Sequence, residues 1–489
     1  MFEYLKNKFY LKNYPAKEVG KEVILLFLLL LWFINPNNKL ILISFLILLC
    51  ILTYLTKKFD ISFVLTFFLS GFFSVGKTYF IQLLNLEEFP DMIKLYPFGL
   101  VTQIQISVSD VLFAFLVVYS IIAIYKKKVN FKKITLTDIF LIIFFFYGIF
   151  ADTVSSRNLF LSFFYKIVLF EYIFMYFFIK LVIKNHQFLF KSFINLIVSL
   201  TLFETFVCFQ QFIHSSPIGK NLEAVTGIQS FGGVPDEISF VFRPIGTFFH
   251  TNIFAMFLTI ILPFFLFFMI RSKKNIFKLV FFLTIACLVL TLSRTAWLAS
   301  LISILLVLFY FEYRKKMILI QFISLKKIVL CLFLVLPLFF YSAPRIAGIS
   351  NILQEGGGLN LRIKQTNEVL GLISQSPLFG TGTGFSVVKA IEKNPKSVFA
   401  SFPNPIHNYF LLLAVENGIP YMGSFIIFLF FSFNKLISYR NDLVFVSLAS
   451  LMTIMIIGLF QPFIVSQLQP LFFLLAFNYD KINNNSYEY

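Results

Sequence analysis

Residues 248–270 read FFHTNIFAMFLTIILPFFLFFMI, and this stretch decides the fold class. It contains no Asp, Glu, Lys or Arg, and it is longer than the ~20 residues that a helix needs to cross a bilayer. In lipid a helix satisfies its own backbone hydrogen bonds, so a segment of this kind is expected to be a membrane-spanning helix.

Comparable apolar stretches recur along the chain and predict fourteen spans. They lie near residues 20–35, 39–56, 60–79, 107–125, 136–152, 158–183, 188–213, 248–270, 275–293, 295–312, 326–343, 407–434, 442–460 and 463–479. The first is short, so the sequence predicts an all-α, polytopic transmembrane helix bundle of about 12–14 spans. No soluble domain is recognisable, and residues 1–489 are expected to form a single transmembrane domain.

The composition excludes a soluble globular protein. Of the 489 residues 59% are hydrophobic and 13% are charged, about half of the ~25% that is usual in soluble domains. The 72 Phe residues make the apolar surface unusually aromatic. Such a chain has too little polar surface to cover itself in water, and a bilayer removes this problem.

The formal net charge of +18 comes from 41 Lys and Arg against 23 Asp and Glu. In a soluble protein this balance would suggest nucleic acid, but here most basic residues lie in short segments between apolar stretches. Clusters such as Lys126–Lys128 and Arg271–Lys274 then mark the cytoplasmic side. The pattern predicts that both termini are cytoplasmic and that membrane lipids, not nucleic acid, are the partner of these charges.

In this topology three long segments are outer loops, at about 80–106, 214–247 and 344–406. The last is the largest and contains a predicted helix near 360–375, followed by Gly380, Gly382 and Gly384. Loops of more than ~15 residues are usually functional or disordered. The aromatic and apolar residues in these loops favour ordered, functional structure that includes short helices.

Arginine is used differently from lysine. The chain has 33 Lys and 8 Arg, yet five arginines fall on the outer side: Arg157, Arg243, Arg294, Arg345 and Arg362. A guanidinium offers a planar fork that can hold phosphate oxygens bidentately, whereas an ammonium is a point charge. The distribution therefore suggests a phosphate-bearing ligand on the outer face. The alternative is that these arginines are interfacial anchors.

Two motifs lie where outer segments enter spans. Arg243, His250 and Asn252 converge at the start of an expected helix, whose N-terminus suits an anion, although a helix cap with interfacial anchors explains them equally. Ser293 and Arg294 occupy a very short outer turn, where a charge needs pairing or solvation. The alternative for Arg294 is an interfacial arginine–tryptophan belt.

Two further motifs belong to the large outer loop. Arg362 precedes a glycine-rich segment that lacks the ending of a P-loop, and its backbone N–H groups could meet an anion or simply form a turn. His407 and Asn408 follow, where the loop re-enters the membrane. His407 could act as a general base or serve a structural purpose. Glu416 lies nine residues on, near the opposite face of an ideal helix, so a direct pair with His407 is not expected.

Two other residue types carry less information. The four cysteines lie inside apolar stretches without metal-ligand spacing, so no metal site and no disulfide framework is expected. Glu171 and Glu204 are acids inside expected spans. They could mark a polar pathway, or form an interhelical hydrogen bond or ion pair with Lys166 as a candidate partner.

Taken in this order, the four motifs resemble the O-antigen ligase and polymerase family of bacterial membrane glycosyltransferases. The resemblance covers roughly residues 200–480 and rests on four pieces: Arg243–Asn252, Ser293-Arg294, Arg362 with Pro377–Phe385, and His407-Asn408 with Glu416-Asn417-Gly418. The chain departs from the family at one point. An Asn-Pro-Asn commonly follows the Gly-Thr-Phe, whereas this chain has His250-Thr251-Asn252.

The resemblance implies transfer of a glycan from an undecaprenyl diphosphate carrier to an acceptor hydroxyl. This would occur at the outer face of the bacterial cytoplasmic membrane, with lipid A-core as the acceptor of a ligase and a glycan repeat unit as the acceptor of a polymerase. No cofactor and no metal is implied, because arginines would stabilise the diphosphate leaving group.

By the same resemblance Arg243 and Arg294 hold the diphosphate, and Arg362 assists them or orients the acceptor. His407 takes the proton of the hydroxyl, which attacks the anomeric carbon with inversion. The remaining motif residues are expected to contact substrate or shape its pocket: His250, Asn252, Ser293, Gly380, Gly382, Gly384, Asn408 and Glu416.

Two rival functions fit the same composition. A flippase or transporter of lipid-linked saccharides would also be polytopic and could bind diphosphate, but transporters often show internal repeats, and none is visible here. A glycosyltransferase that uses a polyprenyl-phosphate sugar would often place acidic residues in an early outer loop, where this chain has Glu87, Glu88 and Asp91.

Overall fold

The computed structural model describes residues 58–72, 81–82, 103–104, 108–126, 134–216, 242–248, 250–315, 358–401, 404–439, 441–462 and 468–482. Within these ranges the chain is helical, apart from a single antiparallel pairing of two residues each, β1 (Ile81–Gln82) with β2 (Gln103–Ile104). The predicted all-α class is confirmed.

The helices vary widely in length. They are α4 (Phe59–Phe72), α6 (Val108–Tyr125), α7 (Leu136–Ser155), α8 (Leu159–Leu181), α9 (His186–His214), α11 (Thr251–Arg271), α12 (Asn275–Leu290), α13 (Arg294–Lys315), α15 (Gly358–Ile373), α16 (Ser386–Lys393), α17 (Val398–Ser401), α18 (Tyr409–Asn417), α19 (Ile419–Ser438), α20 (Asp442–Gly458), α21 (Gln469–Leu475) and the 3-10 helix η8 (Tyr479–Lys481).

Six of these helices are long and apolar enough to cross a membrane: α7, α8, α9, α11, α13 and α19. Four shorter apolar helices accompany them, α4, α6, α12 and α20. Nine of these ten match predicted spans, and α19 covers the second part of the span predicted at 407–434, which confirms a polytopic helix bundle. Helix α15 likewise confirms the helix predicted near 360–375.

One predicted span was wrong. The span at 407–434 is two helices, because the chain turns at Gly418, whose φ of +92° no helix accommodates. Of the span at 463–479 the structure describes residues 468–479, which form the short α21 and the start of η8. The predicted spans 20–35, 39–56 and 326–343 lie outside the described residues, as do most of the outer segments 80–106 and 214–247.

Local sequence explains where the helices begin. Thr135 and Asp138 form a reciprocal capping box at the start of α7. Asn158 and Asn185 accept hydrogen bonds from the backbone N–H groups of the first turns of α8 and α9. These side chains satisfy donors that a helix start leaves without an intrahelical partner.

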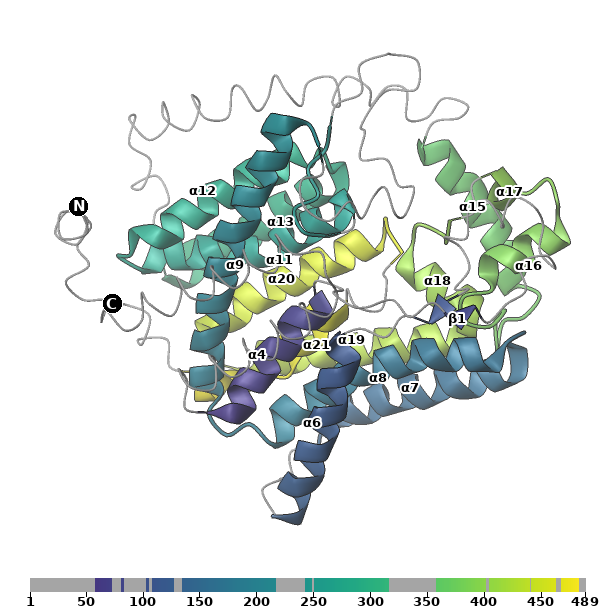
Figure 1. The fold of residues 1–489 in the computed structure, drawn as a ribbon, viewed down its shortest axis with the longest axis horizontal. Helices are drawn as coiled ribbons and strands as arrows, with labels where there is room; N and C mark the ends of the chain where they lie inside the picture. The colour runs from purple at the N-terminus through teal and green to yellow at the C-terminus, as the bar shows by residue number, and fades with distance from the viewer. Residues whose placement is uncertain are drawn as a thin grey trace.

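The helices pack as an antiparallel bundle with one enclosed member. Helix α11 packs against α12, α13 and α20, and most of its side chains are buried. Helices α7, α8 and α19 lie side by side, while α15, α16 and α17 gather at one end of the bundle (Figure 1). Large apolar side chains such as Phe115, Phe146 and Phe309 are exposed on α6, α7 and α13, as expected for surfaces that face lipid.

Charged side chains distinguish the two ends of the bundle. Lys180 at the end of α8 pairs with Asp138 at the start of α7, and Arg271 at the end of α11 pairs with Asp442 at the start of α20. The alternation of helix directions then places the starts of α8, α11, α13 and α19 at the opposite end, together with α15 to α18. The motif residues identified from the sequence lie at that opposite end.

Candidate functional site

Arg243 connects two of the motifs. Its Nε donates to the carbonyl of Thr291 at 2.7 Å, and its Nη2 donates to Oδ1 of Asn252 at 3.2 Å. The first bond reaches the turn between α12 and α13, and the second reaches the first turn of α11. One guanidinium therefore holds the start of α11 beside the turn that carries Ser293 and Arg294.

His250 caps α11. Its Nδ1 accepts from the backbone N–H of Asn252 at 3.0 Å, so the neutral ring carries its proton on Nε2. Burial, and secondarily the nearby cation of Arg243, lower the pKa of His250 to about 4. The cap interpretation that the sequence left open is therefore correct for this ring, and it keeps the imidazole neutral at physiological pH.

Helix α9 holds the segment between Arg243 and His250. Gln211 Oε1 accepts from the N–H groups of Ile245 and Gly246 at 3.0 and 2.9 Å, and its Nε2 donates to the Gly246 carbonyl at 2.7 Å. Glu204 accepts from the N–H and the hydroxyl of Thr247. This buried clamp satisfies the backbone of a segment that has no secondary structure of its own.

The candidate partnership of Lys166 with Glu171 or Glu204 was wrong. Glu204 instead binds Thr247, in the segment before α11, and Glu171 is buried on α8. Lys166 lies against Asp152. Neither acid therefore pairs with Lys166.

The turn between α12 and α13 is short and strained. Leu292 has a φ of +51°, a region that non-glycine residues rarely occupy, and it is buried. Trp297 Nε1 donates to the Leu288 carbonyl at 3.0 Å and fixes the first turn of α13 to α12. Helix α13 begins at Arg294, which is half-buried, next to the buried Ser293. The guanidinium therefore accompanies the positive end of a helix.

His407 and Arg362 complete this group. Burial lowers the pKa of His407 to about 4, and the cation of Arg362 and the ring of His250 contribute. The three side chains are therefore close enough to interact electrostatically. His407 precedes α18, which Asn408 caps by accepting from Leu411 N at 3.0 Å, and Arg362 lies on α15, which packs against α18.

The glycine loop, residues 380–384, closes the other end of α18. Thr381 N donates to the Val415 carbonyl and Gly382 N donates to the Glu416 carbonyl, both at 2.8 Å. These carbonyls belong to the last turn of α18 and have no intrahelical donor. Gly380 has a φ of +69°, and a Cβ on it would lie 2.4 Å from the Glu416 carbonyl carbon, so only glycine fits there.

The other N–H groups of the glycine loop also have partners within the protein. Gly380 N donates to the Ser376 carbonyl at 3.0 Å, Thr383 N donates to Asp152 Oδ1 at 2.8 Å, and Gly384 N binds the Glu416 carboxylate. The loop therefore acts as a clamp on α18 rather than as a cradle of free donors for an anion.

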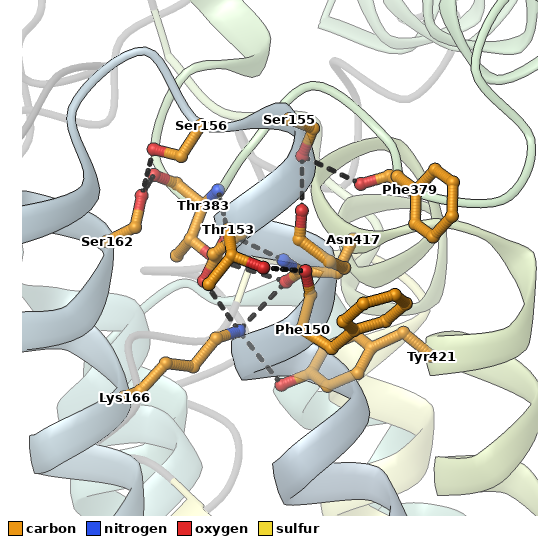
Figure 2. Close-up of polar contacts among 12 residues, drawn as sticks. Phe150, Thr153, Ser155, Ser156, Ser162, Lys166, Phe379, Thr383, Asn417 and Tyr421 are labelled. Atoms are coloured by element: carbon orange, nitrogen blue, oxygen red, sulfur yellow. Dashed lines mark hydrogen bonds and ion pairs between the residues drawn. The ribbon is translucent and has the colours of Figure 1, made fainter.

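A buried polar network anchors this clamp to the membrane helices. Asp152 on α7 accepts from Thr383 and from Asn417 Nδ2, while Lys166 on α8 donates to Asn417 Oδ1 at 2.9 Å and to the Tyr421 hydroxyl at 3.3 Å. Figure 2 shows Lys166, Thr383, Asn417 and Tyr421 pointing toward one another from α8, the glycine loop and the α18–α19 corner.

Residues 279–428 match the family model described as O-Antigen ligase. Over these residues the chain is similar to O-antigen ligases. The matched residues run from α12 into α19 and contain Ser293, Arg294, Arg362, His407 and Glu416. No curated protein matches the chain.

The predicted site residues separate into two groups. The arginine–histidine cluster brings together seven of them, six at the starts of α11, α13 and α18 and Arg362 on α15: Arg243, His250, Asn252, Ser293, Arg294, Arg362 and His407. Glu416 and the glycine loop lie at the far end of α18, roughly 13 Å away for nine residues of helix. Asn408 is the cap between them.

The sequence reasoning missed the network around Asp152. A charged residue inside an apolar helix is costly in lipid, which was a signal for Asp152 and Lys166. Their partners Thr383 and Asn417 stand within motifs that the sequence did single out, but the contacts between α7, α8 and the O-antigen ligase region appear only in three dimensions. Within the described ranges, no group of three or more His, Cys, Asp or Glu side chains is placed to hold a metal ion.

Proposed function

We propose that this protein is an inverting, metal-independent membrane glycosyltransferase of the O-antigen ligase or polymerase type. It transfers a glycan from an undecaprenyl diphosphate carrier to an acceptor hydroxyl, with lipid A-core or a glycan repeat unit as acceptor. The family match supports a reaction of this general type. The observation that carries the proposal is the arginine–histidine cluster at three helix starts.

The cluster suits a diphosphate. Arg243, Arg294 and Arg362 supply cations, and α11 and α13 present N-terminal ends whose partial positive charge favours anions. Guanidinium groups can donate two parallel hydrogen bonds to phosphate oxygens. In the transfer step the bond between the anomeric carbon and the diphosphate oxygen breaks, and these cations stabilise the charge that develops on the leaving group.

His407 is suited to act as the general base. Its lowered pKa keeps the ring neutral at physiological pH, so it can accept a proton. The acceptor oxygen attacks the anomeric carbon from the side opposite the diphosphate, which inverts that centre, and the hydroxyl proton passes to His407. Arg362, which lies within electrostatic range of this ring, orients the acceptor or assists the other arginines.

The remaining motif residues hold this arrangement. The glycine loop and Glu416 fix the far end of α18, whose other end carries His407. We place the cluster at the outer face of the bacterial cytoplasmic membrane, with both termini in the cytoplasm, because the lysine-rich segments then lie on the inside.

The test is transfer of labelled glycan by purified protein in the presence of EDTA. Undecaprenyl diphosphate-linked glycan serves as donor, and lipid A-core and free repeat units are offered as separate acceptors. We expect transfer by the wild type and its loss in His407→Ala and in Arg294→Ala. Lys273→Ala, at the opposite end of the bundle, is the control and retains activity.

The acceptor that is used distinguishes ligase from polymerase. Activity that requires an added divalent metal would contradict the arginine-based mechanism. Donor binding without transfer to either acceptor, combined with movement of the donor across liposome membranes, would replace the proposal by a flippase.

A further inference from the structure

A cavity of about 650 Å³ opens beside the glycine loop. Its lining includes Ser155 at the end of α7, Arg157 after it, Gln375 after α15, Phe379, and Lys389 and Glu392 on α16. The volume is within the range of ligand sites in proteins, roughly 300–1,000 Å³. None of these residues belongs to the arginine–histidine cluster.

The lining has the chemistry that sugars require. Arg157 is ion-paired with Glu392, and Lys389 Nζ lies 3.9 Å from the same carboxylate. A guanidinium and an ammonium donate hydrogen bonds, a carboxylate accepts them, and the Gln375 amide does both. Sugar hydroxyls both donate and accept, and sugar C–H groups pack against the faces of aromatic rings. Phe379 supplies such a ring; it is half-buried and forms a T-shaped contact with Phe150.

Two helices, α15 and α18, extend from the cavity to the arginine–histidine cluster. Leu372 lines the cavity and lies ten residues after Arg362 on α15, which corresponds to roughly 15 Å along the helix. Helix α18 packs against α15 and runs from His407 to Glu416, beside Gly380 at the cavity. A ligand in the cavity is therefore too far away to react at His407, but an extended glycan of a few sugar units could occupy both places.

We propose that this cavity is a distal saccharide subsite, which binds a sugar unit of the glycan remote from the bond that is formed. The inference rests on the proposed function and adds the site at which the protein recognises the structure of the glycan. Contacts with non-reacting parts of a substrate supply binding energy that positions the reacting end.

One side of the cavity is held by hydrogen bonds, and the other carries exposed side chains that can be substituted. Thr381 N donates to the Val415 carbonyl of α18, and the Ser155 hydroxyl donates to the Phe379 carbonyl, so this side keeps its shape. Arg157 and Glu392, by contrast, have side chains that are 47% and 39% exposed, so they can be changed without opening the core. The melting temperature of each variant verifies that it folds.

The experiment compares two donors with purified full-length protein. One is the undecaprenyl diphosphate-linked glycan purified from the host, and the other is the same carrier with only its first sugar. For Arg157→Ala and Glu392→Gln we expect KM for the full glycan to rise about tenfold at constant kcat, and no change with the single-sugar donor. Lys396→Ala, an exposed cation of the same outer segment that does not line the cavity, is the matched control and leaves both constants unchanged.

A charge-swapped variant separates sugar binding from a structural ion pair. Arg157→Glu combined with Glu392→Arg restores the pair but reverses the groups that meet the sugar, so we expect KM to remain high. Full recovery in the swapped variant, or unchanged KM in the single variants while the wild type uses both donors, would overturn the subsite alone. Failure of the wild type to transfer from either donor would overturn the proposed function itself.

Discussion

Lys166 Nζ lies 3.5 Å from Asp152 Oδ2 between α8 and α7, and both side chains are only 4% exposed. The carboxylate is fully used, because Oδ1 also accepts from Thr383 N and from Asn417 Nδ2, both at 2.8 Å. A buried ion pair is tolerated when its remaining hydrogen-bonding capacity is satisfied, as it is here. The pair therefore joins two membrane helices to both segments that carry the motif residues of the large outer loop.

Removal of the carboxylate should be more harmful than removal of the ammonium. Asp152→Ala leaves Lys166 buried without its counter-ion and leaves donors of Thr383 and Asn417 unsatisfied, a cost of about 3–5 kcal/mol. Lys166→Met leaves a carboxylate that still accepts these hydrogen bonds. We expect melting temperatures in detergent to fall in both, and further in Asp152→Ala.

The double variant Asp152→Ala with Lys166→Met completes the thermodynamic cycle. If the two residues act as a pair, its loss of stability should be smaller than the sum of the two single losses. Additive losses would show that the pair contributes nothing beyond its separate contacts.

Substitution by alanine should have opposite effects on stability at Gly418, just before α19, and at Gly423, within its first turns. A Cβ on Gly418 would lie 1.8 Å from the Leu378 carbonyl oxygen, and its φ of +92° is unfavourable for any side chain. Gly418→Ala should therefore cost more than about 2 kcal/mol and reduce transfer activity.

Gly423 is the matched control. It lies within α19, and a Cβ there would meet nothing within 4 Å. Gly423→Ala should leave activity unchanged and keep or raise the melting temperature, since alanine is favoured over glycine inside a helix. Equal destabilisation by the two substitutions would mean that the α18–α19 corner is not built as described.

The spans were predictable because their signal is local. Length and apolarity are properties of consecutive residues, and nine predicted spans correspond to single apolar helices. The error at 407–434 arose because the apolar character continues through Gly418. The sequence did contain a warning, since Pro420 stands in the first turn of α19, a position that proline favours at a helix start.

The composition of the site was predictable and its geometry was not. Arginine, histidine and glycine residues at entry points to the membrane could be selected one motif at a time. The nine-residue spacing did predict that Glu416 lies away from His407. The proximity of Arg362 to His407 depends instead on how α15 packs against α18, and no spacing in the sequence encodes that packing. The ties of Asp152 to Thr383 and Asn417 join positions more than 200 residues apart.

The activity that depends on His407 should persist to unusually low pH. Its pKa is lowered to about 4 by burial, by Arg362 and by His250, so the free enzyme keeps a neutral base down to that pH. The acid limb of kcat/KM, which reports the free enzyme, should lie near pH 4 instead of near 6.5. Arg362→Met removes a neighbouring cation and should move the limb to higher pH. A limb near 6.5 in the wild type would contradict the burial of this base.

The same shift makes a prediction for stability. Between pH 6.5 and 4 the unfolded chain binds a proton at His407 that the folded protein does not, so the folded state loses stability as the pH falls through this range. In His407→Gln this part of the loss should disappear. Melting temperatures of both proteins at pH 7, 6 and 5 would reveal the difference, and parallel curves would argue against it.

Arg294 should not tolerate lysine. The substitution keeps the charge but removes the planar fork, so we expect kcat/KM for transfer to fall more than tenfold while the melting temperature changes little. Arg271→Lys is the control, because Arg271 pairs with Asp442 at the opposite end of the bundle and a point charge suffices there. Full activity of Arg294→Lys would show that this residue does not hold the diphosphate bidentately.

Lys396 and Lys273 should lie on opposite sides of the membrane. Both are exposed, Lys396 between α16 and α17 and Lys273 between α11 and α12, next to the Arg271–Asp442 pair. Each is replaced by cysteine in a parent protein from which Cys50 and Cys331 have been removed. Cys208 and Cys287 can stay, because they are buried and do not react with the label. In intact spheroplasts a membrane-impermeant maleimide should label Lys396→Cys at once, and Lys273→Cys only after the membrane is permeabilised. The reverse pattern would place the arginine–histidine cluster in the cytoplasm, where a lipid-linked glycan awaiting transfer at the outer face could not reach it.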